Sequence, residues 1–156
     1  MTTGRSLAVL QFAALIVMAL ALVPGGAHLL ELPNKMSLPP EQYMIVQGIY
    51  RGWALLGIVL FGALFLTGLH TMAVRTDKLA MVLSLVAMLC LAANLALFFA
   101  FTYPMNVASS NWTVVPPNFE AARRQWEYSH AINAGLTLIA LASLLASVLT
   151  TRRGPT

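Results

Sequence analysis

Four long apolar runs constrain the fold of this chain more than any other feature. They cover about residues 7–30, 52–74, 79–103 and 130–150. A run of about 20 apolar residues crosses a hydrocarbon core of about 30 Å, and a backbone in lipid satisfies its own hydrogen bonds only as a helix or a closed barrel. Of the 156 residues, 59% are hydrophobic and 9% are charged, which is too apolar for a water-soluble domain of this size. We therefore predict an all-α fold, a four-transmembrane-helix bundle in which residues 1–156 form a single integral membrane domain.

The first apolar run has some features of a signal peptide, because Arg5 precedes it and a small-residue stretch, Gly25-Gly26-Ala27, follows it. However, it is apolar from Leu7 to Val23, which is longer than the core of an ordinary signal peptide. We interpret it as a retained membrane helix, and Pro24 with its neighbouring glycines is expected to kink the end of that helix.

The basic residues lie at the ends of the apolar runs and give the predicted orientation. Four spans place both termini on one side of the bilayer. That side carries five basic residues and the other carries four: Arg5, Arg75, Lys78, Arg152 and Arg153 against Lys35, Arg51, Arg123 and Arg124. This small bias favours cytoplasmic termini in a bacterial inner membrane. Because these residues form no continuous basic stripe, no nucleic-acid partner is expected; the expected partner is the lipid bilayer, and a homo-oligomer remains open.

The two connections on the side opposite the termini, residues 31–47 and 104–129, are the longer loops. Each contains a proline pair before a stretch that can run as a helix into the next span, and proline suits a first helical turn. Asn118 is a suitable N-cap, with Glu120 in the first turn. The fourth helix is therefore expected to extend from about residue 118 to 150, a length of about 50 Å at 1.5 Å per residue.

Polar residues gather at one depth near the outer end of the predicted bundle. Counting the helical rise from the cytoplasmic ends places His28, Arg51 and His130 each about 30–35 Å away, at the outer edge of the bilayer. Seven further residues lie near this level or continue it into the membrane: Gln47, Tyr50, Tyr103, Trp126, Glu127, Asn94 and Asn133. Ionisable and polar side chains at such depths usually face the bundle interior and often mark a functional site.

Two acid–histidine pairs reinforce this layer. His28 and Glu31 are three residues apart, as are Glu127 and His130, so each pair shares one helix face. Three interpretations remain open. One transition metal could be held by His28, His130, Glu31 and Glu127; a haem could be held by the two histidines; or the same residues could bind an organic ligand or simply join helix ends. A protein that binds no cofactor is therefore also among the open interpretations.

Other polar features are interpreted as structural. His70 lies near the cytoplasmic edge and is expected to be an interface residue. Gly48 and Gly52 have the spacing of a helix-packing contact. Arg51 is either a ligand clamp, paired with Glu31 or Glu127, or an interface residue whose head group reaches water.

Three stretches carry a resemblance to a known family: "AHLLELPNK" after the first helix, "VQGIYRGWALLG" before the second, and "NWTVVPPNFEAARRQWEYSHAINA" before the fourth. Together they resemble bacterial members of the anthrone oxygenase-like family of small four-helix membrane proteins. The resemblance covers nearly the whole chain. It implies a membrane four-helix fold and, more distantly, the oxygen-dependent oxidation of an apolar phenolic or polycyclic substrate.

If that chemistry applies, position and residue type assign the following roles. His28 or His130 would take a proton from the activated methylene, and Arg51 or Tyr50 would stabilise the oxyanion. The residues expected to bind the ligand are Glu31, Glu127, Trp126, Asn133, Asn94 and Tyr103. The alternative is a non-enzymatic membrane subunit, or a small-ligand or haem-binding protein, that uses the same outer residues.

Overall fold

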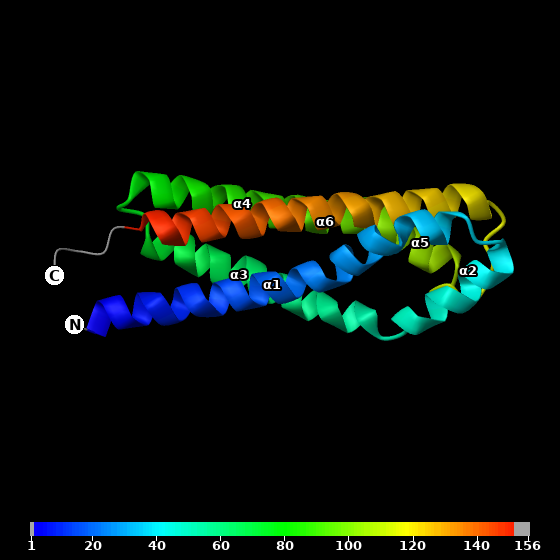
Figure 1. The fold of residues 1–156 in the computed structure, drawn as a ribbon, viewed down its shortest axis with the longest axis horizontal. Helices are drawn as coiled ribbons and strands as arrows, with labels where there is room; N and C mark the ends of the chain where they lie inside the picture. The colour runs from blue at the N-terminus through cyan, green and yellow to red at the C-terminus, as the bar shows by residue number, and fades with distance from the viewer. Residues whose placement is uncertain (1, 152–156) are drawn as a thin grey trace.

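The computed structural model describes residues 2–151, which form an all-α bundle (Figure 1). The four long helices are α1 (Thr2–Met36), α3 (Gly57–Ala73), α4 (Lys78–Leu97) and α6 (Phe119–Thr150). The connections contain α2 (Pro40–Gln47), the 3₁₀ turns η1 (Gly48–Tyr50) and η2 (Trp53–Leu56), the π-helical turn η3 (Phe98–Thr102) and α5 (Tyr103–Ala108). Arg152 and Arg153, which enter the predicted charge bias, lie outside the described residues.

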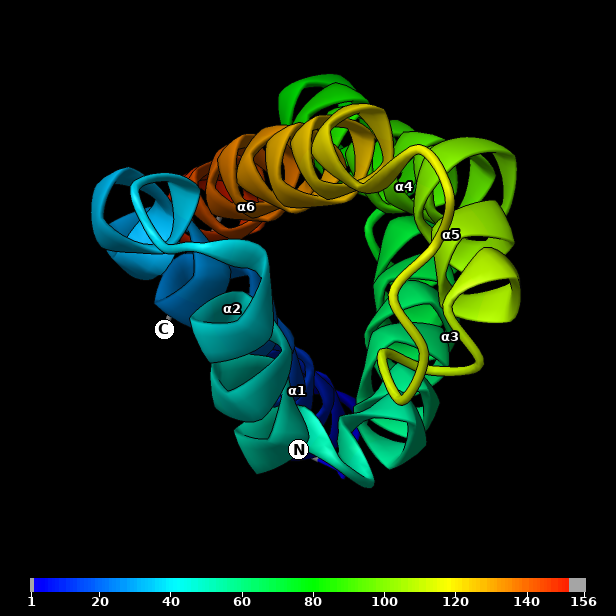
Figure 2. The same cartoon turned by 90° about the vertical axis from the view of Figure 1, so that its right-hand side faces the viewer.

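The four long helices form a ring in which each packs against two others. α6 lies against α1 and α4, and α3 lies against the other side of the same two helices (Figure 2). α1 begins and α6 ends at the same end of the bundle, which we call the proximal end; α2 and α5 cover the opposite, distal end (Figure 1). Four segments are long and apolar enough to cross a bilayer, namely Gly4–Met36, Trp53–Ala73, Lys78–Ala108 and Phe119–Thr150. The chain is therefore an integral membrane protein with a four-helix bundle fold.

Small and aliphatic side chains fill the middle of the bundle. The fully buried members are Ala14, Met18, Ala63, Ala87, Leu91, Ala140 and Leu144. Larger apolar side chains such as Phe12 and Phe61, which are 69% and 54% exposed, face outward where lipid surrounds the bundle. Because lipid tails are as apolar as the core, close packing rather than the hydrophobic effect holds the helices together, and alanines permit that packing.

α1 continues six residues beyond the predicted end at Leu30, even though Pro24 and Pro33 lie inside it. Beside Pro24, a Cβ on Gly25 would come within 3.2 Å of the Ala134 Cα atom on α6. The glycine therefore allows the two helices to approach closely. In its distal part, α1 bends toward α6 (Figure 1). This bend brings the C-terminal end of α1 next to the N-terminal end of α6.

The turn before the second span differs from the prediction. Gly52 has φ +90°, a left-handed conformation that favours glycine. A Cβ on Gly48 or Gly52 would meet nothing within 4 Å, so the expected glycine packing contact is wrong. The turn instead separates η1 from η2 and directs the chain from α2 down into α3.

Candidate functional site

A polar cluster fills the distal end of the bundle between α1, α2, η1 and α6. We call it the distal cluster and define it by nine residues: His28, Glu31, Lys35, Tyr43, Gln47, Tyr50, Trp126, Glu127 and His130. His28, Glu31 and Lys35 fall on one face of α1, because residues three and four apart are neighbours on a helix. The extension of α1 to Met36 therefore determines the composition of the cluster.

The two predicted histidines meet at its centre. The ring centroids of His28 and His130 are 4.3 Å apart, and both rings contact Trp126, at 4.8 and 4.2 Å. The His28 ring also lies 4.4 Å from that of Tyr50. His28 is 3% exposed, whereas His130 is half-buried. One imidazole is therefore enclosed by aromatic rings and the other lies at the edge of the cluster.

Beside the imidazoles lies a buried ion pair. The Lys35 Nζ atom is 2.7 Å from the Glu127 Oε1 atom, and the two residues are 3% and 0% exposed. The Tyr43 hydroxyl donates to the same Oε1 atom at 2.8 Å. Gln47 accepts from Lys35 at 3.2 Å and donates to the Tyr43 hydroxyl at 2.7 Å. Buried charges are stable only when paired and hydrogen-bonded in this way.

Aromatic rings surround the Lys35 ammonium group on several sides. Its Nζ atom lies 4.6 Å from the Tyr50 ring centroid, 4.9 Å from that of Trp126 and 5.5 Å from that of Tyr43. The electron-rich faces of aromatic rings attract a cation at such distances. Since the rings of Tyr50 and Trp126 also contact His28, the ammonium group and the imidazole share two neighbours.

Glu31 lies at the more open side of the cluster. Its side chain is 36% exposed and accepts a hydrogen bond from the Tyr50 hydroxyl. Its Oε2 atom lies 3.9 Å from the Nδ1 atom of His28 and 4.0 Å from the Nζ atom of Lys35. This carboxylate therefore connects the imidazole pair to the ion pair.

Tyr43, on α2, lies outside the membrane-spanning segments. Burial, followed by the negative charge of Glu127 and the hydrogen bond to it, raises the pKa of the Tyr43 phenol well above its ordinary value. The phenol therefore remains protonated and acts as a donor to Glu127.

Several buried polar atoms near the distal end have no hydrogen-bond partner among the residues described. They are His28 Nδ1, Glu127 Oε2, Asn133 Oδ1, Arg123 Nε and Trp112 Nε1. A buried polar atom without a partner costs free energy, so such atoms often mark a functional or solvated site. His28 Nδ1 and Glu127 Oε2 belong to the distal cluster and are able to bind a polar group.

A strained loop at residues 110–112 covers the distal side of the cluster. Ser110, Asn111 and Trp112 have φ values of 48°, 56° and 62°, a left-handed conformation that non-glycine residues rarely adopt. The Ser109 hydroxyl accepts from the Trp112 backbone N–H at 2.9 Å and holds this conformation. The Trp112 ring consequently packs on Tyr43 and Trp126, with centroids 5.3 and 5.4 Å apart.

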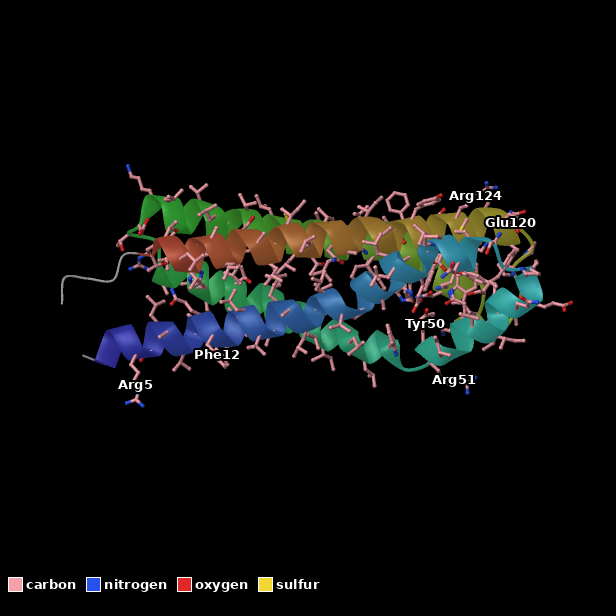
Figure 3. All side chains as sticks on the ribbon, viewed as in Figure 1. Arg5, Phe12, Tyr50, Arg51, Glu120 and Arg124 are labelled. Atoms are coloured by element: carbon pink, nitrogen blue, oxygen red, sulfur yellow. The ribbon has the colours of Figure 1, made fainter. Side chains whose placement is uncertain are left out.

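Three predicted site residues lie elsewhere. Arg51 is exposed, and its side chain points away from the bundle (Figure 3). Tyr103 is 50% exposed and packs on Phe98 and Phe99 on the surface. Asn94 is buried but joins α4 to α6 at a deeper level, donating to the Asn133 carbonyl oxygen at 3.2 Å and to the Thr137 hydroxyl at 2.8 Å.

Sequence reasoning missed Lys35 and Tyr43 as site residues, and it placed Gln47 at the right depth without giving it a role. Lys35 occupies the place expected for Arg51: it is the cation that pairs with Glu127 and lies near Glu31. The i,i+4 spacing of Glu31 with Lys35, and of Tyr43 with Gln47, is the signal that could have identified them.

The structure does not bring together the ligand set that the metal interpretation requires. Across residues 2–151, no three histidine, cysteine, aspartate or glutamate side chains are grouped so that they could hold a metal ion. The direct contact between the His28 and His130 rings, at 4.3 Å, leaves no room for a porphyrin plane between them. The arrangement therefore fits neither a four-residue metal site nor a haem with both histidines as axial ligands.

His70, expected at the membrane interface, is instead fully buried near the proximal end. Its Nδ1 atom lies 3.1 Å from the Ser84 hydroxyl, which in turn lies 2.7 Å from that of Thr71. On the other side, the Gln11 amide nitrogen lies 3.5 Å from His70 Nε2. These bonds join α1, α3 and α4, so His70 is a structural residue of a second, proximal polar group.

Comparisons with known proteins add no relative: no family model, no curated protein and no solved structure matches the chain. The chemistry of the distal cluster is therefore the basis for a functional proposal.

Proposed function

We propose that this protein is a membrane oxidoreductase of the anthrone oxygenase type, acting on an apolar phenolic or polycyclic substrate at the distal cluster. The resemblance of the loop motifs supports this proposal, and so does the chemistry of the residues that those motifs contain. We also propose that the membrane is a bacterial inner membrane and that the proximal end is cytoplasmic.

The observation that carries the proposal is the contact, through shared aromatic rings, between the imidazole pair of buried His28 and half-buried His130 and the buried ammonium–carboxylate pair. An imidazole is a suitable base for a methylene proton made acidic by a neighbouring carbonyl group and aromatic rings. The ammonium group is a fixed positive charge in surroundings with little water, where it stabilises a developing oxyanion.

The proposed reaction converts a ring methylene and one O₂ molecule into a ring carbonyl and one water molecule. His130, with His28 behind it, takes a proton from the methylene and leaves an enolate. Lys35 and the Tyr50 hydroxyl stabilise the enolate oxygen, in the role first predicted for Arg51. The electron-rich carbon then bonds to O₂, and the resulting hydroperoxide loses water to give the carbonyl group.

The test is turnover of anthrone and its dihydroxy derivative by the protein in detergent or nanodiscs, followed as O₂ uptake and quinone absorbance. We expect His130→Ala and Lys35→Met to lower the rate by about 100-fold or more, which is the usual contribution of general acid–base or oxyanion groups. Arg51→Ala is the matched control and should leave the rate unchanged, because the Arg51 side chain is exposed and points away from the bundle. Wild-type rates no higher than in buffer alone would refute the proposal.

A second candidate is a non-enzymatic membrane subunit or small-ligand-binding protein. The dense pairing within the cluster favours it, because Lys35, Glu127, Tyr43 and Gln47 already bind one another. In addition, two open surface depressions lie at the proximal end, beside Leu7 and Ala73. Turnover that is absent in the wild type would support this candidate, whereas a loss of stability in Lys35→Met is expected under both candidates.

A further inference from the structure

Exposed apolar side chains lie on both sides of the turn at Gly52, in the second membrane span and in the segment that precedes it. On α3 and η2, Ile58 and Leu55 are 72% and 71% exposed and face the lipid. Above the turn, Ile49 on η1 and Ile45 on α2 are 64% and 76% exposed. We call Ile45, Ile49, Leu55 and Ile58 the α2–α3 stripe. Its lower half belongs to a membrane span, whereas its upper half lies outside every apolar span of the chain.

This surface carries far fewer charged residues than the rest of the distal end. Between Glu41 and Arg75, Arg51 is the only Asp, Glu, Lys or Arg residue. Arg51 is exposed and points outward at the turn (Figure 3). The distal part of α6, in contrast, exposes Glu120 and Arg124, as expected for a surface in water (Figure 3).

The level of the stripe follows from the helical rise. The 20 residues from Ala73 back to Trp53 rise by about 30 Å, which equals the thickness of the hydrocarbon core. Arg51 then lies just outside the core, at the depth of the lipid phosphates. Ile49 is about 6 Å and Ile45 about 12 Å beyond Trp53 at most, and the headgroup layer is about 5–8 Å thick on each side.

We propose that residues 45–55 form a membrane-contact surface at the distal leaflet, with Leu55 at the edge of the hydrocarbon core, Ile49 in the headgroup layer, Ile45 at the outer border of that layer, and the Arg51 guanidinium group on a lipid phosphate. Lipid is the partner because this segment directly precedes a membrane span whose own exposed apolar side chains are surrounded by lipid. An apolar surface with a basic group on its border is the usual composition of an interfacial segment, and a guanidinium group binds phosphate oxygens in a fixed geometry. This assignment also gives Arg51 a role, and it is independent of the proposed enzymatic activity.

The surface lies directly beside the distal cluster. Tyr50, between Ile49 and Arg51, donates to Glu31 and contacts His28. Seated in lipid, this segment would place the cluster next to the headgroup layer rather than next to bulk water. An apolar ligand would then reach Glu31 and Tyr50 from the bilayer.

The proposal is tested with spin labels in phospholipid nanodiscs. Single cysteines replace Leu55, Ile49, Ile45 and Val114 in a Cys90→Ala background, and each carries a spin label. Power saturation then measures how often the label collides with O₂, which partitions into lipid, and with a water-soluble nickel chelate. Val114→Cys is the matched control, because Val114 is also apolar and 57% exposed but lies in the loop above the cluster. Labels at these exposed positions replace no packed side chain, so the variants should fold.

We expect the ratio of O₂ to nickel collisions to fall in the order Leu55, Ile49, Ile45, Val114, and to be about threefold or more higher at Ile49 than at Val114. Equal ratios at Ile49 and Val114 would overturn the membrane-contact surface. For Arg51, guanidinium-to-phosphorus dipolar dephasing in solid-state NMR should lose one arginine signal in Arg51→Gln. An unchanged set of dephased arginine signals would overturn the phosphate contact.

Discussion

The buried pair of Lys35 and Glu127 should be strongly coupled, and a double-mutant cycle measures that coupling. The two charged atoms are 2.7 Å apart on side chains that are 3% and 0% exposed. Removing one partner of such a pair leaves an uncompensated buried charge, which costs about 3–5 kcal/mol. We therefore expect Lys35→Met and Glu127→Gln each to lower the free energy of unfolding by about 3 kcal/mol.

The double variant should lose much less than the sum of the two single variants. Once both charges are absent, no unpaired charge remains, so the interaction energy of the cycle should be about 2 kcal/mol or more. The assay is equilibrium unfolding in mixed detergent micelles, followed by circular dichroism. Tyr43 and Gln47 remain in all four proteins, so the bonds that they make with each other are common to the cycle.

The chain contains a matched control pair. Arg123 Nη2 and Glu120 Oε2 are also 2.7 Å apart, but the Glu120 side chain is 56% exposed. Arg123 is buried, but water reaches the Glu120 carboxylate and screens the pair; such a pair contributes about 0–1 kcal/mol, so the cycle of Arg123→Met with Glu120→Gln should give a small interaction energy. Additive losses in the Lys35–Glu127 cycle, or equal interaction energies in the two cycles, would refute the argument that burial makes this pair strong.

Three further predictions concern packing, backbone strain and pH. Gly25→Ala should destabilise the protein by about 1–3 kcal/mol, because the added Cβ would press on Ala134. Gly26→Ala should not destabilise it, because nothing lies within 4 Å of the added Cβ. Thermal melts of the two variants check this difference. Asn111→Gly should raise the free energy of unfolding by about 1 kcal/mol, because glycine adopts its φ of 56° without strain, and a loss of stability in unfolding experiments would contradict this account of the loop. The stability that Tyr43 contributes, measured as the difference between wild type and Tyr43→Phe, should be fully present below about pH 10 and decrease as the pH rises above it, since folding raises the phenol pKa above its unfolded value. A difference that grows above that pH would have the wrong sign.

The spans could be predicted from the sequence because apolar length is a direct physical requirement of the bilayer. The predicted fourth-helix start near residue 118 lies one residue from the observed start of α6 at Phe119. The end of the first helix was harder to predict, because Pro33 suggests a break and α1 nevertheless continues to Met36. Beside Pro24, Gly25 allows α1 to pack closely on α6.

The same difficulty explains the mixed result for the site. His28, His130, Glu31 and Glu127 were predicted by counting helical rise, which gives depth, and the structure does bring them into one cluster. Rise along a helix does not give direction around it, so Arg51 was placed at the right depth but on the wrong side. The direction of Arg51 depends on the left-handed turn at Gly52, and the contact between Lys35 and Glu127 depends on the bend of α1.

The apolar middle of the bundle separates the two polar groups and has a consequence for proton transfer. Between the distal cluster and the His70 group lie Met18, Leu91 and Leu144, all fully buried in one hydrophobic core. A chain of hydrogen bonds needs donors and acceptors at every step, and these side chains provide none. In the proposed reaction, a proton taken up by His28 or His130 would therefore return to the distal side, and the chemistry there would neither consume nor build a transmembrane proton gradient.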